Sequence, residues 1–275
     1  MTASRLFALA CACLVGPAMA ADKPLWELGA GLSALQLPDY RGSGHSRLYA
    51  VPFPYVVYRG DFLKADRNGL RGVFVDSERV DLNLSVGASL PVDSTRNEAR
   101  RGMPDLKPSV EIGPSLDLTL WRDSRRQYKL DLRLPLRYGY TVSQSPSNIG
   151  WVFSPRLNLD ITDPFGLTGW NLGLLAGPMI DSRRNDQYFY SVDPAYATAR
   201  RPAYTARGGY AGTQVLVSVS KRYPKFWLGG FVRRDNLAGA NFADSPLVTS
   251  RHYFAAGLGV AWVLGESTRR VERDE

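Results

Sequence analysis

The sequence predicts an all-β protein, a transmembrane antiparallel β-barrel of about 12 strands (ten as the alternative), with a cleaved N-terminal signal peptide. Two long runs, residues 110–120 and 128–140, carry this prediction because apolar and polar residues alternate strictly in both. Successive side chains of a strand point to opposite faces, so a period of two indicates strands. Each run is long enough to form a tilted transmembrane strand, which takes about 9–11 residues. One face is apolar and the other charged, as a strand between lipid and a polar lumen requires.

The N-terminus predicts export through a secretory signal. Arg5 supplies a basic start, residues 6–15 are apolar, and Pro17 precedes the small residues of a cleavage site. We expect cleavage between Ala20 and Ala21. The apolar stretch is too short for a spanning helix, which needs about 20 residues.

Composition excludes several classes of site. Both cysteines, Cys11 and Cys13, lie in the predicted signal, so the mature chain lacks a disulfide, a thiolate metal site and a cysteine nucleophile. We expect no cofactor and no metal.

The formal net charge of +8 suggests an anionic partner. Export and dispersed arginines favour phosphorylated lipopolysaccharide or cell-wall polymer over nucleic acid. The mean hydropathy is −0.21, and the sequence has no second long apolar stretch that could form a spanning helix. If the mature protein spans a membrane, it must therefore do so as a closed barrel.

Alternation recurs along the mature chain and defines the remaining strands. Asn68-Gly69 predicts a type I′ turn between two short strands, and Pro52 and Pro54 suit an edge strand or a bulge. If the short hairpin folds inward, ten full strands remain. The twelve predicted strands cover residues 26–34, 49–57, two segments between 62 and 75, 80–90, 110–120, 128–140, 151–161, 170–180, 211–219, 226–232 and 254–264.

Connection lengths predict the orientation. Long connections (36–47, 91–106, 141–149, 181–207, 236–250) alternate with short ones, apart from the tight turn at Asn68-Gly69. Long loops of such barrels are extracellular and short turns periplasmic, which places both termini in the periplasm. A soluble sandwich or lipocalin-like barrel would also alternate, but strand length, aromatic residues near strand ends and loop asymmetry argue against it. We expect three segments: a signal over 1–20, a barrel over 21–264 and a charged tail over 265–275.

The polar faces of the strands carry full charges that we expect in the lumen. If these charges pair, they fill the lumen, and if they stay hydrated, they line a conduit. The predicted lumen-facing charges are Glu27, Asp81, Glu111, Asp117, Lys129, Asp131, Arg133, Arg137, Arg156 and Asp160.

Short motifs in a fixed order resemble the MltA-interacting protein (MipA/OmpV) family of outer-membrane proteins. They are residues 40–43 (YRGS), 52–54 (PFP), 58–61 (YRGD), 76–82 (DSERVDL), 112–114 (IGP) and 239–248 (GANFADSPLV). The resemblance implies a scaffold that joins a murein-degrading lytic transglycosylase to a murein-synthesising enzyme. One departure is that Trp262 is followed by a charged tail, whereas outer-membrane barrels commonly end on an aromatic residue.

Two other functions compete with the scaffold: a narrow pore for small solutes, and a lipid A-modifying hydrolase. A hydrolase would use His252 as a base beside Ser250, but no compact motif supplies both a nucleophile and an orienting carboxylate. His45 lies in a polar loop. We therefore expect no catalytic residue.

Arginines cluster in two of the long loops, and guanidinium groups match phosphate in bidentate fashion. We expect lipopolysaccharide contacts there, although solvated loop charges would give the same pattern. The candidate contacts are Arg96, Arg100, Arg101, Arg183, Arg184, Arg200 and Arg201, with Arg207 beside them.

Overall fold

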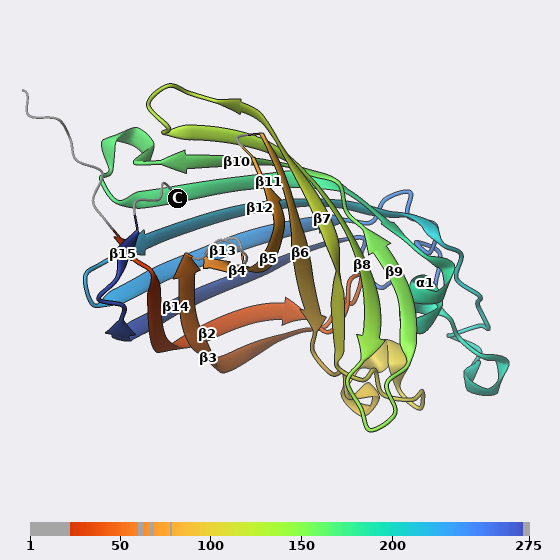
Figure 1. Ribbon diagram of the computed structural model, residues 1–275. Helices are drawn as coiled ribbons and strands as arrows, with labels where there is room; N and C mark the ends of the chain where they lie inside the picture. The colour runs from red at the N-terminus through yellow and green to blue at the C-terminus, as the bar shows by residue number, and fades with distance from the viewer. Residues whose placement is uncertain (1–22, 60–62, 67–68, 78, 272–275) are drawn as a thin grey trace, which may run out of the picture.

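The chain folds into one closed antiparallel β-barrel, seen in a computed structural model that describes residues 23–59, 63–66, 69–77 and 79–271 (Figure 1). The wall consists of β2 (Trp26–Pro38), β3 (Ser46–Arg59), β4 (Leu63–Asp66), β5 (Gly69–Asp76), β6 (Val80–Ser89), β7 (Ser109–Arg122), β8 (Tyr128–Thr141), β9 (Asn148–Phe153), β10 (Arg156–Thr162), β11 (Trp170–Asp181), β12 (Gly209–Arg222), β13 (Phe226–Asn236) and β14 (His252–Glu266).

Smaller elements lie in the connections and at the ends of the chain. They are β1 (Lys23–Pro24), β15 (Arg270–Val271), the helix α1 (Arg183–Tyr190) and the 3₁₀ turns η1 (Ser94–Arg96), η2 (Glu98–Arg100), η3 (Pro164–Gly166) and η4 (Pro194–Tyr196). Among the described residues, no helix is long and apolar enough to cross a membrane.

Neighbouring strands pair in chain order, and β14 pairs with β2 to close the wall. Over the described residues the sheet has thirteen strands, but β9 and β10 both lie between β8 and β11 and form one interrupted strand. Counted as one, they give the twelve strands that the sequence predicts. The interruption falls at Ser154 and Pro155 inside the predicted strand 151–161, where proline cannot donate to a ladder.

The predicted short hairpin is present in the wall. β4 and β5 pair with Asp66 opposite Gly69, so two residues connect them. Asn68 of the predicted turn lies outside the described residues. Among the residues that the structure describes, β4 pairs with β3 at Tyr58 and Arg59 alone. The hairpin therefore completes the ring of strands, as in the twelve-strand prediction. Its strands are shorter than the neighbouring ones, as in the ten-strand alternative.

Side-chain alternation separates an apolar outer face from a polar inner one. On β8, Asp131 and Arg137 are buried inward while Tyr138 and Tyr140 are exposed outward. On β3, Tyr49, Phe53 and Tyr55 turn inward, and the outer face carries small residues and Leu48, which is 72% exposed. The strand pattern thus follows the expectation for a barrel between lipid and a polar lumen.

All five long connections gather at one end of the barrel, which we call the loop end, and the short turns lie at the other, the turn end (Figure 1). The described chain also begins and finishes at the turn end, where β1 pairs with β15. β14 continues to Glu266, two residues past the predicted limit of the barrel at 264. The predicted tail is therefore partly ordered, and the predicted signal cleavage site lies outside the described residues.

Close backbone packing generates a test of this wall. A Cβ at Gly113, on the inner face of β7, would overlap the Leu136 carbonyl oxygen of β8. Overpacking costs about 1–3 kcal/mol where side chains can yield, and a paired backbone yields less. We expect Gly113→Val to abolish the compact, heat-modifiable gel species. Gly259→Ala is the control, because its Cβ would lie 3.5 Å from the Phe53 ring. Equal heat-modifiability of the two variants would contradict the strand register between β7 and β8.

Candidate functional site

The lumen near the turn end contains a charge network centred on Arg133. Its guanidinium lies 3.4 Å from Asp160, 3.6 Å from Asp131 and 3.8 Å from Asp117. Lys129 adds a second ion pair to Asp131 at 2.9 Å. The alternation of β7, β8 and β10 turns these residues inward, and the strand register brings opposite charges together. Buried charges need such partners, because an isolated ion in low dielectric is costly.

Further ion pairs cross the remaining lumen. Arg137 donates to Glu111 at 3.0 Å and to Ser85 at 3.3 Å. Arg222 donates to Glu27 at 2.6 Å, joining strands far apart in sequence. Asp81 accepts a hydrogen bond from Asn83. The sequence predicted the inward faces but not these partners, because cross-barrel distances depend on register and curvature.

Arg156 differs from the other predicted lumen charges. Its Nε is buried and has no hydrogen-bond partner, and no ion pair involves it among the described residues. Two cavities, of about 400 Å³ and about 420 Å³, both reach Arg156 and Leu175. The first extends toward the loop end and the second toward the turn end. Arg156 therefore stands where the two halves of the lumen meet.

A packed cluster of apolar side chains, which we call the plug, lies at the loop end. Apolar side chains from four of the long connections, joined by residues at adjoining strand ends, form one buried cluster, in which the Tyr190 and Phe242 rings stack at 3.7 Å. Phe242, Leu237 and Leu247 are fully buried there. The sequence placed these residues in loops, where apolar side chains carry no periodic signal, so sequence reasoning did not find the plug.

Arg41 fastens the plug to the wall. Its guanidinium lies 3.4 Å from Asp235 on β13 and 3.8 Å from Asp181 on β11, and it donates to the Ala211 carbonyl at 2.9 Å. Tyr190 of α1 donates in turn to the Arg41 carbonyl at 3.0 Å. The only sequence signal for Arg41 is its place in the family-like motif 40–43.

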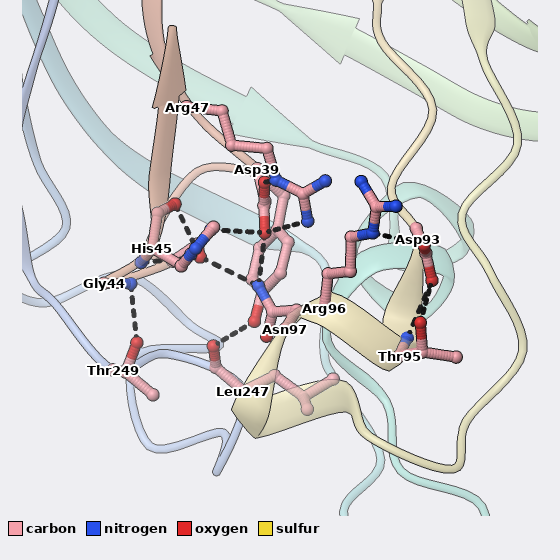
Figure 2. Close-up of polar contacts among 12 residues, drawn as sticks. Asp39, Gly44, His45, Arg47, Asp93, Thr95, Arg96, Asn97, Leu247 and Thr249 are labelled. Carbon is pink, nitrogen blue, oxygen red and sulfur yellow. Dashed lines mark hydrogen bonds and ion pairs between the residues drawn. The ribbon is translucent and has the colours of Figure 1, made fainter.

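Asp39 forms a second junction between loops (Figure 2). Its carboxylate accepts from Asn97 at 2.7 Å and lies 2.8 Å from Arg47 and 3.2 Å from His45. Asn97 belongs to the connection between β6 and β7, so this contact joins it to the β2–β3 connection. Asn97 is buried with Asp39, and a hydrogen bond to a charged group is stronger than a neutral one.

The predicted lipopolysaccharide contacts separate into two groups. Arg100 is buried and donates to the carbonyls of Phe189 and Pro104, and Arg201 donates to the carbonyls of Tyr196 and Ala99. These two guanidinium groups therefore donate hydrogen bonds to carbonyls of the loops. Of the predicted contacts, Arg96, Arg101, Arg183, Arg184 and Arg200 are exposed at the loop end, and so is Arg207 beside them.

The histidines do not form a hydrolytic centre in the described structure. Ser250 donates to the His252 backbone carbonyl at 2.7 Å rather than to its imidazole. Asp244, an acid in the connection before His252, pairs with Arg251 at 3.0 Å. Within the described ranges, no group of three or more histidine, cysteine, aspartate or glutamate side chains is placed to hold a metal ion.

The family model for MltA-interacting protein MipA matches residues 30–264. The chain belongs to this family. It is 24% identical over 213 residues to the outer membrane protein OmpV of Vibrio cholerae, covering 74% of this chain and 75% of that protein. The outer membrane protein Omp26La of Vibrio anguillarum is 23% identical over the same shares. These relatives place the barrel in the outer membrane.

A solved outer-membrane channel from Pseudomonas putida gives a weaker likeness. It covers 91% of this chain and 100% of the channel, at 13% identity and a TM-score of 0.39. At that score the likeness carries no argument, so the fold rests on the strand pairings of this chain.

One buried acid in the plug generates a prediction about pH. Asp186 of α1 is fully buried, and neither carboxylate oxygen has a hydrogen-bond donor among the described residues. Burial, together with the nearby charge of Asp181, raises the pKa of Asp186 to about 9. The folded state therefore holds a proton that the unfolded chain releases above its ordinary pKa of 3.8. This contribution to stability is full below that value and declines as pH rises towards the folded pKa.

We expect the thermal transition of the wild type to fall as pH rises from about 5 to about 9. Asp186→Asn removes the titrating group, so its transition should fall less and should exceed that of the wild type at the alkaline end. Tryptophan fluorescence during heating measures both. Asp244→Asn, an exposed loop acid whose side chain is 88% accessible, is the control. Parallel pH profiles for wild type and Asp186→Asn would contradict the assignment.

Proposed function

We propose that this protein is a non-enzymatic outer-membrane adaptor that brings a murein-degrading lytic transglycosylase and a murein-synthesising enzyme together. The observation that carries this proposal is the combination of a plugged loop end and an ion-paired lumen. Nine of the ten predicted lumen charges have a partner, Arg156 being the exception among the described residues. Paired charges fill a lumen rather than line a conduit. The family name, which refers to a lytic transglycosylase partner, supports the same function.

The turn end offers a surface for a periplasmic partner. Phe165 of η3 is 92% exposed and has a positive φ of 55°, and Leu167 beside it is 54% exposed. A bulky residue held in this conformation is uncommon, and such strain concentrates at functional positions. Lys221 stabilises the turn by donating to the Thr168 carbonyl at 3.0 Å. The exposed apolar pair therefore resembles an anchor for a protein partner.

The proposal predicts that Phe165→Ser weakens capture of a purified lytic transglycosylase by at least about tenfold, as loss of an interface aromatic does. A pull-down with the full-length outer-membrane protein measures this. Val142→Ser is the matched control, because Val142 is 58% exposed but lies at the loop end. Capture that is unchanged by Phe165→Ser, or equally reduced by Val142→Ser, would argue against docking at the turn end.

The second candidate function is a narrow pore, which the two cavities in series favour. Planar-bilayer recordings separate the two candidates, because the adaptor should show no steady conductance while still capturing a murein enzyme. Steady conductance without any murein partner would reverse the ranking.

The separated histidine, serine and carboxylate generate a prediction about hydrolysis. A general base must lie within hydrogen-bond reach of the proton that it takes, and the Ser250 hydroxyl is engaged with a backbone carbonyl. We expect His252→Ala and Ser250→Ala to leave lipid A acylation and barrel assembly unchanged, as mass spectrometry of lipid A would measure. A change in acyl number on expression of the wild type, lost in His252→Ala, would establish an enzyme instead.

A further inference from the structure

The barrel wall is incomplete between β3 and β6. β3 pairs with β2 at thirteen positions, from Ser46 to Tyr58, but meets β4 only at Tyr58 and Arg59. β6 pairs with β7 along its whole length, whereas its pairing with β5 ends at Asn83. Within the described ranges, residues 46–57 of β3 and 84–89 of β6 therefore have a strand on one edge only. We call this gap the window.

The sequence of β3 fits a free edge facing lipid. The ladder to β2 runs without a break through Pro52 and Pro54, so the N–H groups that these prolines lack would have pointed to the other edge. Each unsatisfied N–H costs several kcal/mol in hydrocarbon. Two prolines on the free edge remove two such donors, which is where strand prolines belong.

The window has defined upper and lower borders. The β4–β5 hairpin closes it toward the turn end, because in the described part of the chain that hairpin joins β3 to β6 there. The Asn97–Asp39 hydrogen bond closes it toward the loop end (Figure 2). The opening therefore lies within the wall and below the plug, at the level of the outer half of the barrel.

The cavity near the loop end extends to the window. Tyr49 of β3 lines it, and so do residues 86–90 on β6 and just beyond it, which include both inward-facing and outward-facing positions. A Cβ at Gly87 would lie 3.1 Å from Glu111 Oε2 and 3.4 Å from Arg137 Nε, which form an ion pair with each other. Because Gly87 has no side chain, the charged interior begins directly behind the edge of β6.

The charge of this cavity favours an anion. Four arginines and three carboxylates line it. Three of these arginines pair with a carboxylate: Arg41 with Asp181, Arg137 with Glu111 and Arg233 with Asp235. Arg156 is the remaining cation and has no ion pair among the described residues. The volume of about 400 Å³ is in the range of small-molecule sites.

We propose that the window is a lateral portal for an anionic single-chain amphiphile, whose head group binds Arg156 and whose alkyl chain lies between β3 and β6. The apolar rim residues Val86 and Leu90 contact the chain where it leaves the lumen. The head group is a phosphate or a carboxylate, which share the chemistry that a guanidinium recognises. The outer membrane supplies the amphiphile directly, so the plug can remain closed. This inference goes beyond the adaptor function and holds whether or not a murein enzyme binds.

Photocrosslinking tests the portal in the full mature protein held in lipid vesicles. The probes are dodecyl phosphate, dodecanoate and neutral dodecanol, each with a diazirine on the alkyl chain. We expect both anionic probes to label peptides that contain residues 46–57 and 80–90, with dodecanol labelling them about tenfold less. The more strongly labelling anion identifies the preferred head group. Even labelling around the barrel by all three probes would overturn the proposal.

Two variants separate the portal from its anion site. Ala88→Trp fills the rim of the window and should abolish labelling, whereas Ala176→Trp, an exposed alanine on β11, should not. Arg156→Gln should lower labelling by the anionic probes about tenfold or more, the ratio for a lost hydrogen bond to a charged group. Arg156→Lys should retain it. Heat-modifiable migration shows that each variant is folded. The anion site would be disproved if Arg156→Gln folds and is labelled as strongly as the wild type. The portal would be disproved if Ala88→Trp and Ala176→Trp change the labelling equally.

Discussion

The lack of water inside a bilayer is the constraint on which this structure depends. Each backbone N–H and C=O in the hydrocarbon layer needs a partner, and a ring of paired strands provides one everywhere except along the window. Closure forces successive side chains alternately into lipid and into the lumen. Charges such as Asp131 and Arg133 are then confined in a narrow space, where they are stable only as pairs. The ion-paired lumen is therefore a consequence of the closed wall.

The plug follows from the same geometry. Long connections at one end of a ring lie close together, so their apolar side chains can bury one another around Phe242. Arg41 links that cluster to two wall strands by ion pairs with Asp181 and Asp235. With the plug fixed in this way, we propose partners at the turn end and at the lateral window, one from the periplasm and one from the membrane.

Much of the fold could be predicted from residues that repeat with period two. The twelve strands, the alternation of long and short connections and the inward face of residues such as Glu111 all follow from that period. The roles of Arg100 and Arg201 could not, because a loop arginine looks the same whether it meets solvent or a carbonyl. Asp186 gave no signal either, since nothing in its neighbourhood along the chain indicates burial.

The sequence by itself determined which side chains share a face, since that property depends only on neighbours two positions apart. It also determined the family, through short motifs in order. The tertiary structure alone decided which inward charges pair. Within the described part of the chain, it also decided that Arg156 Nε has no hydrogen-bond partner and that β3 has a free edge. Those features depend on strand register, hairpin length and curvature around the ring. They are set by contacts between residues far apart in the chain, where a local pattern has no influence.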